Sequence, residues 1–204
     1  DRLIEKLTPR IEKLKVGPYT AGDDVDFGPV VTSAAKQNIL NLVQSGIDQG
    51  AELVIDGRDF SLQGYENGFF VGPHLFDRVT PDMDIYKKEI FGPVLSTVRA
   101  GSYEEAIGLA MSHEYGNGTA IFTRDGDTAR DFANRINIGM VGVNVPIPVP
   151  LAYHTFGGWK KSVFGDLNQH GPDAFKFYTR TKTVTSRWPS GIKEGGEFNF
   201  KAMD

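Results

Sequence analysis

The 204-residue sequence contains no cysteine, which excludes a disulfide framework, a thiolate metal site and a cysteine nucleophile within these residues. It also has no apolar run near the roughly 18 residues that a transmembrane helix needs, so we expect no membrane association. The net charge of −4 comes without a basic patch or stripe, and a nucleic-acid partner is therefore not expected. The composition is otherwise globular, with 40% hydrophobic and 24% charged residues.

Metal-ligand patterns are also missing. None of the four histidines has the spacing of a metal-binding set, so each is expected to be a surface or packed residue: His74, His113, His154 and His170. No Gly-x-Ser-x-Gly elbow is present either, so the sequence gives no support for serine hydrolysis. We therefore expect neither a metal site nor a complete set of catalytic residues in this chain.

The sequence begins inside a charged helical pattern, without an initiator Met or a signal peptide (DRLIE). We expect a truncated form of a longer chain; the alternative is a mature N-terminus left by processing. Without a secretion signal, a cytoplasmic location is expected, or the mitochondrial matrix if the source is eukaryotic.

Strand and helix patterns alternate along most of the chain, which predicts an α/β fold, a sheet with flanking helices. Apolar spacing predicts helices over residues 3–14, 33–50, 103–112 and 125–136. β-forming runs predict strands at residues 51–55, 68–73, 94–99, 118–123 and 141–144.

The end of the chain has a different pattern. Residues 178–188 (YTRTKTVTSRW) alternate Thr with other residues and predict a strand with one polar face, at an edge or paired with a partner. Residues 190–204 are Gly-rich and polar and predict a tail. The expected organisation is a domain over residues 1–177 and an arm with a tail over residues 178–204.

Residues 87–94 (KKEIFGPV) place a carboxylate and an aromatic ring two positions apart before a Gly-Pro turn. If the backbone is extended there, the side chains of Glu89 and Phe91 emerge from one face. A carboxylate can accept two hydrogen bonds from paired hydroxyls, and an aromatic ring can pack against a planar ligand. The residues alone also allow a second interpretation, a solvated Glu89 and a core Phe91 before a strand.

Residues 89–94 (EIFGPV) resemble a signature of the aldehyde dehydrogenase family. Further stretches match in family order, through about Trp188: residues 68–73 (GFFVGP), 114–123 (EYGNGTAIFT), 138–144 (IGMVGVN) and 156–162 (FGGWKKS). The resemblance implies the catalytic-domain fold of that family with a C-terminal oligomerisation strand arm. It further implies an NAD site in which Glu89 holds the ribose hydroxyls beside the nicotinamide, with Phe91 packing near that ring.

One branch of the family is more similar still. Residues 143–150 (VNVPIPVP), 164–168 (FGDLN) and 175–180 (FKFYTR) are similar to segments of CoA-acylating methylmalonate-semialdehyde dehydrogenases. This resemblance implies oxidation of malonate or methylmalonate semialdehyde, with NAD and CoA, to acetyl-CoA or propionyl-CoA with loss of CO₂. Alternating prolines forbid a helix, so residues 145–150 are expected to form a stiff extended loop.

Phe156 and the glycines after it allow two interpretations each. From the residues alone Phe156 is either a pocket wall or a core residue, and the resemblance implies that it faces the substrate. Gly157 and Gly158 with Lys160 and Lys161 form either an anion-binding nest or a tight turn beside a solvated lysine pair; the missing P-loop spacing favours the turn.

The resemblance places the nucleophilic cysteine of the family upstream of the matched region. It therefore implies no catalytic residue in this chain, inactivity of the chain alone, and a homo-oligomer, dimer or tetramer, formed through the arm. Two alternatives stay open. The chain could be a self-standing, non-catalytic oligomerisation or regulatory module descended from such an enzyme, or a doubly wound α/β domain without an assignable ligand.

Overall fold

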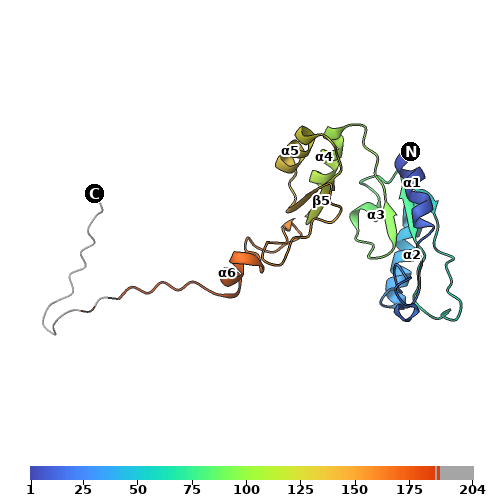
Figure 1. Cartoon of the computed structure of the whole chain (residues 1–204), viewed down its shortest axis with the longest axis horizontal. Helices are drawn as coiled ribbons and strands as arrows, with labels where there is room; N and C mark the ends of the chain where they lie inside the picture. The colour runs from blue at the N-terminus through green and yellow to red at the C-terminus, as the bar shows by residue number, and fades with distance from the viewer. Residues whose placement is uncertain (187, 189–204) are drawn as a thin grey trace. The chain divides into compact units, whose positions relative to one another are not determined.

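A computed structural model describes residues 1–186 and 188 of the chain (Figure 1). The chain divides into two compact units, Asp1–Gly116 with Thr123–Asn137, and Asn117–Phe122 with Ile138–Asp204. Among the described residues, no helix combines the length and the apolar content that a membrane crossing requires.

The first unit is built around a three-stranded sheet in the order β1-β2-β3. The central strand β2 runs antiparallel to β1 and parallel to β3. Figure 1 shows the helices of this unit, whose elements are α1 (Arg2–Ile11), η1 (Tyr19–Ala21), α2 (Ser33–Asp48), β1 (Glu52–Ile55), β2 (His74–Asp77), α3 (Asp84–Lys87), β3 (Val94–Ser96), α4 (Tyr103–Ser112), β4 (Tyr115–Gly116) and α5 (Gly126–Arg135).

The core of the first unit lies between α2 and the sheet. Ile39 and Val43 are four positions apart and share one face of α2, and both are buried with Phe76 of β2 in one cluster. Fully burying a side chain of this size contributes about 1.5–3 kcal/mol. Met83 and Ile85, at the start of α3, belong to the same cluster.

Three helices of this unit begin at a side chain that caps the free backbone N–H groups. Thr32 accepts from the Ala35 N–H at 3.0 Å, Ser102 from the Glu105 N–H at 3.1 Å, and Asp125 from the Thr128 N–H at 2.7 Å. Each such cap is worth about 1 kcal/mol, which is why the sequence pattern locates these helix starts well.

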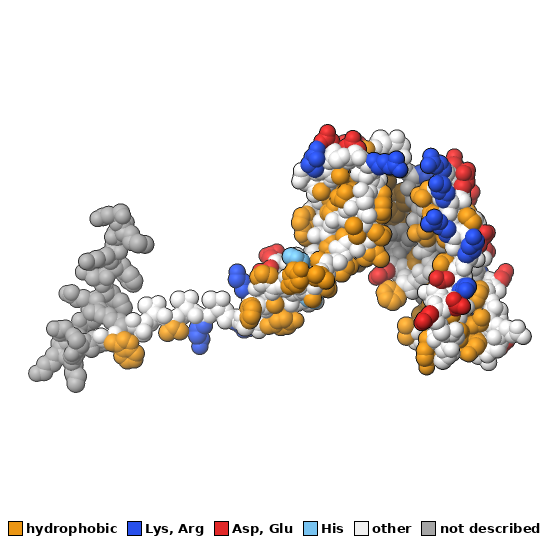
Figure 2. Space-filling view, in the orientation of Figure 1, with side chains coloured by type: hydrophobic (Ala, Val, Ile, Leu, Met, Phe, Trp, Pro, Cys, Tyr) orange, Lys and Arg blue, Asp and Glu red, His pale blue; other side chains and the backbone are white. Residues whose placement is uncertain are grey.

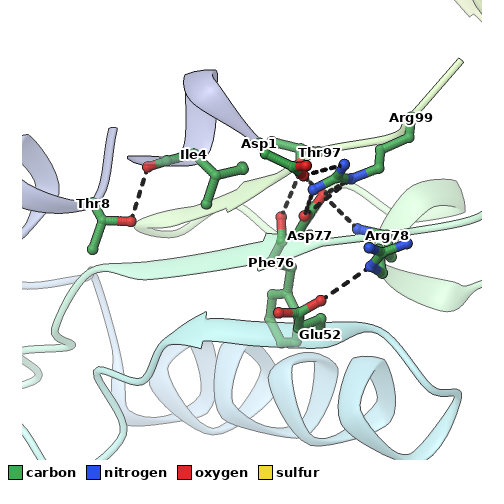
Figure 3. Close-up of polar contacts among 9 residues, drawn as sticks. All are labelled: Asp1, Ile4, Thr8, Glu52, Phe76, Asp77, Arg78, Thr97 and Arg99. Atoms are coloured by element: carbon green, nitrogen blue, oxygen red, sulfur yellow. Dashed lines mark hydrogen bonds and ion pairs between the residues drawn. The ribbon is translucent and has the colours of Figure 1, made fainter. Parts of the chain in front are cut away.

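Ion pairs in the first unit join residues that are distant in sequence. Asp77, at the end of β2, is buried and receives the guanidinium of Arg99 and the Thr97 hydroxyl, the latter at 2.9 Å (Figure 3). Arg135 of α5 reaches Glu104 of α4 at 2.5 Å. Charged groups that are this far apart in sequence fix tertiary contacts that a local pattern does not show.

The second unit contains a parallel pair of strands, β5 (Gly118–Ile121) and β6 (Met140–Val143). Asn144 ends β6 with a positive φ of 59°, and its N–H donates to Ile121 O at 2.8 Å. Its other described elements are β7 (Trp159–Lys160), η2 (Gly171–Asp173) and α6 (Ala174–Tyr178). Residues 145–150 form a loop and no helix, as their prolines predict, with bends at Pro146 and Ile147.

The α/β class is confirmed, and most predicted elements are present with shifted ends. The helix predicted at residues 3–14 ends at Ile11, and the one predicted at residues 33–50 ends at Asp48. The described strands form more than one sheet, where one sheet was expected.

The strand predicted at residues 68–73 is wrong. This stretch is irregular, although Phe70 and Val71 are buried, and the strand follows it as β2. Gly72 lies against Gly57, where a methyl group on Gly72 would come within 2.8 Å of Gly57 O. The apolar residues of this stretch are therefore explained by burial in an irregular segment that packs against Gly57, and not by a place in a sheet.

The strand predicted at residues 178–188 is not formed by the described part of that segment, residues 178–186 and 188. A strand needs hydrogen bonds to a neighbouring strand, and the described residues of this single chain offer none there. The predicted tail over residues 190–204 lies outside the described residues. The division at residue 177 stays a prediction.

Candidate functional site

Residues 89–93 are held on the core of the first unit by their backbone. Gly92 lies against Ile39 of α2, so closely that a methyl group on Gly92 would come within 2.6 Å of Ile39 Cδ1. Pro93 O accepts from the His74 N–H at 2.8 Å, and Ile90 packs against the buried cluster. The segment therefore has a fixed backbone, from which Glu89 and Phe91 project.

The Glu89 side chain is exposed, and among the described residues it has no hydrogen bond or ion pair. Its two cationic neighbours are turned elsewhere. Lys88 Nζ lies 3.1 Å from Asp84 Oδ2, and Lys87 Nζ donates to Asp82 O at 2.7 Å. An exposed carboxylate that no neighbour neutralises keeps both oxygens free to accept hydrogen bonds from a ligand.

Phe91 is 81% exposed, so the interpretation of this residue as a core phenylalanine is wrong. Its φ of 57° lies in the left-handed region, which an aromatic residue adopts rarely and at an energetic cost. The backbone is therefore not extended at Phe91, and an extended backbone was the condition for Glu89 and Phe91 to emerge from one face. An apolar ring held in solvent by a strained backbone is a feature that a purely structural role does not require.

Phe156 lies in the second unit, half-buried, on the rim of a hollow of about 330 Å³. The hollow is also lined by Asn117 and Asn168, and by the rings of Phe164 and Phe177. A half-buried ring that lines a hollow is not a fully enclosed core residue, and the assignment of Phe156 to the substrate stays a prediction. The space-filling view shows exposed hydrophobic side chains in this part of the chain (Figure 2).

The turn after Phe156 is tight, as predicted. Gly157 and Gly158 have φ values of 66° and 87°, which side-chain-bearing residues rarely adopt. The Gly157 N–H donates to Thr155 Oγ1 at 3.2 Å, and Gly139 lies so close that a methyl group there would meet Gly158 N at 2.2 Å. Backbone contact with the residue before β6 therefore fixes the position from which the Phe156 ring projects.

The histidines occupy surface or packed positions: His154 is exposed, His113 and His170 are half-buried, and His74 is buried. The part of the chain that the structure describes contains no cluster of three or more His, Asp or Glu side chains that could hold a metal ion. Burial lowers the pKa of His74, and the nearby Asp56 carboxylate, 3.9 Å from His74 Nε2, opposes this effect.

Of the two buried polar residues of β2, the sequence allows a packed His74 but does not single out Asp77. The guanidinium of Arg99 lowers the pKa of Asp77 well below its usual range, against the opposing effect of burial. No local pattern marks Asp77, because its partner Arg99 lies 22 residues further along the sequence. The backbone of His74 supports residues 89–93, since its N–H is the donor to Pro93 O.

The profile described as "Aldehyde dehydrogenase family" matches residues 1–184, and the chain belongs to this family. A crystal structure from Sinorhizobium meliloti 1021, assigned as a methylmalonate-semialdehyde dehydrogenase and complexed with NAD, has 74% sequence identity and a TM-score of 0.87. The match covers 95% of this chain and 39% of the chain in that crystal structure. This confirms the expected aldehyde dehydrogenase fold.

Two curated relatives carry names of the same kind as that structure. The malonate-semialdehyde dehydrogenase of Pseudomonas aeruginosa is 57% identical over all 204 residues, which is 41% of its own length. The mitochondrial, acylating methylmalonate-semialdehyde dehydrogenase of Arabidopsis thaliana is 50% identical over 186 residues, 90% of this chain and 30% of its own length. The chain thus spans about two fifths or less of the length of these two relatives.

Proposed function

We propose that this chain supplies part of the active site of an NAD-dependent, CoA-acylating malonate- or methylmalonate-semialdehyde dehydrogenase. The observation that carries the proposal is the pair Glu89 and Phe91, both exposed on a backbone that is anchored to the core. The similarity to relatives with these two activities supports the choice of substrate class.

The described residues fit the nicotinamide end of NAD. The Glu89 carboxylate, without a partner among the described residues, can accept a hydrogen bond from each of two neighbouring ribose hydroxyls. The Phe91 ring offers an apolar face for the planar nicotinamide. NAD, when bound, supplies the hydride acceptor for oxidation of the aldehyde.

The role of this chain is binding and orientation. Phe156 is proposed as an apolar wall for the semialdehyde at the hollow of the second unit. The reaction also needs a thiolate that attacks the aldehyde, and donors that stabilise the resulting oxyanion. The 204 residues contain no cysteine. We therefore propose that the thiolate comes from outside them and that CoA, as the second substrate, receives the acyl group.

The test is Glu89→Gln in the intact protein that contains this chain. Wild type is expected to form NADH from malonate or methylmalonate semialdehyde in the presence of CoA. Loss of a charged hydrogen-bond acceptor costs about 1.5–3 kcal/mol, so the variant should raise the KM for NAD or lower kcat roughly ten- to a hundredfold. Steady-state kinetics at varied NAD and varied semialdehyde separate the two effects.

Glu12→Gln is the matched control. Glu12 is an exposed residue at the end of α1, and its substitution removes the same charge from the same unit. It should leave both kinetic constants unchanged. Equal kinetics for wild type and Glu89→Gln would contradict the assigned role of Glu89. Absence of NADH formation by the wild-type protein would favour the alternative, a non-catalytic module.

A further inference from the structure

The ring of His170 is stacked on the ring of Phe156. The two ring centroids are 4.2 Å apart and the ring planes are inclined by 21°. The two residues come from segments 14 positions apart, and both line the same hollow of about 330 Å³. A hollow of this size is at the lower end of the range for small-molecule sites, about 300–1,000 Å³.

A second contact holds the same two segments together. Gly171 has a φ of 71°, and a methyl group on it would come within 2.6 Å of Tyr153 O. The backbone beside His170 therefore lies directly on the backbone that leads to Phe156. The turn after Phe156 is itself fixed by the contact between Gly157 and Gly139. The backbone beside His170 and the backbone beside Phe156 are therefore each held by a close contact of their own.

The stacked ring limits where Phe156 can go. A half-buried phenylalanine on the rim of a hollow can rotate into or away from it unless one of its faces is covered. His170 covers one face of the Phe156 ring, and both residues line the hollow. Aromatic pairs of this kind are worth enough to bias such a choice by roughly two- to tenfold.

We propose that His170 is a positioning residue, which orients Phe156 as a wall of the substrate site and so sets the discrimination between semialdehydes with and without a methyl branch. The proposal rests on the proposed function and extends it to a residue that has no assigned role. His170 acts through the ring that it stacks on, and a flat ring at this position is what matters, since stacking needs neither its charge nor its N–H.

The experiment compares three substitutions in the intact protein: His170→Ala removes the ring, His170→Gln keeps a polar group without a ring, and His170→Phe keeps a ring without the polar atoms. Kinetic constants are measured for malonate semialdehyde, methylmalonate semialdehyde and NAD. The Ala and Gln variants should raise the KM for the semialdehydes roughly two- to tenfold and change the ratio of kcat/KM between the two substrates. The KM for NAD should stay as in wild type, and His170→Phe should restore most of the loss.

His154→Ala is the matched control. His154 lies in the same part of the chain, and its ring is paired with that of Tyr153, with centroids 4.4 Å apart, but it does not line the hollow. It should leave the substrate ratio unchanged. A crystal structure of His170→Ala reports the position of the Phe156 ring independently of turnover, and a displaced ring is expected.

Three results would overturn the proposal: an unchanged substrate ratio in His170→Ala, a Phe variant as impaired as the Ala variant, or an undisplaced Phe156 ring. If His170→Ala does not fold, the contrast between Phe and Gln decides in the same way. Wild-type protein that oxidises neither semialdehyde would instead refute the proposed function, and the crystal structure would still test whether His170 orients Phe156.

Discussion

Gly92 is packed directly against Ile39, with no room for a side chain between them: a methyl group on Gly92 would lie 2.6 Å from Ile39 Cδ1 and 2.9 Å from Cγ1. Ile39 is one of the most deeply buried residues of the first unit. This contact is one of those that attach the residues proposed to hold the cofactor to the core.

Gly92→Ala is therefore expected to push residues 89–93 away from α2. Overpacking of this kind costs about 1–3 kcal/mol of stability, and the shifted Glu89 and Phe91 should raise the KM for NAD. Urea unfolding and steady-state kinetics measure the two effects. Gly108→Ala is the control, because nothing lies near Gly108 in α4, and it should gain about 0.5–1 kcal/mol. Wild-type stability and wild-type KM in Gly92→Ala would contradict the packing.

One feature of the site, the backbone conformation of Phe91, could not be predicted from the sequence. The motif residues Glu89 and Phe91 were identified from their chemistry and from the family resemblance. The positive φ of Phe91 could not be, because aromatic residues rarely adopt it. It is a local cost that contacts distant in the sequence maintain.

Helices and buried strands differed in how well the sequence predicted them. The bounds of α4 were predicted to the residue, because Ser102 is a cap and the apolar positions that follow have helical spacing. In contrast, β2 is buried on both faces and carries His74 and Asp77, so it shows neither an alternating nor a purely apolar pattern. The partners that make the buried Asp77 tolerable, Thr97 and Arg99, lie elsewhere in the chain.

Asp77→Asn should destabilise the protein at neutral pH. The guanidinium of Arg99 holds the pKa of the buried Asp77 below its unfolded value of about 3.9. The charged form therefore stabilises the fold fully above pH 4, and this contribution declines as the pH falls below that value. We expect a loss of about 1.5–3 kcal/mol at pH 7, measured by urea unfolding, and a smaller difference from wild type near pH 3.

Asp1→Asn is the control for this variant. Asp1 pairs with the same guanidinium, at 2.7 Å, but its side chain is 80% exposed (Figure 3). Exposed pairs contribute about 0–1 kcal/mol, so the change should be small. If Asp1→Asn and Asp77→Asn had equal effects, the burial of Asp77 would not be the source of its contribution.

His74→Leu should make the protein less sensitive to mild acid. Burial is the main cause of the lowered pKa of His74, so the folded state keeps its imidazole neutral while the unfolded state is protonated below about pH 6.5. Stability therefore falls as the pH drops from 6.5 toward 5, by up to about 1.4 kcal/mol per pH unit for one such group. Unfolding midpoints at pH 7, 6 and 5 should have a shallower slope in the variant. Parallel slopes would show that another group is responsible.

Deletion of residues 178–204 is expected to prevent assembly. From Phe175 onward every described residue is exposed, and Tyr178, Val184 and Trp188 leave 72%, 74% and 90% of their surface uncovered. Apolar side chains and unpaired backbone groups favour pairing with another sheet edge, which a second copy of the protein can provide. Sedimentation velocity of the intact protein should show a dimer or tetramer, and the protein ending at residue 177 should sediment as a monomer. A protein ending at Trp188 keeps the alternating segment and should remain assembled, and an oligomer that survives the longer deletion would show that other surfaces hold the copies together.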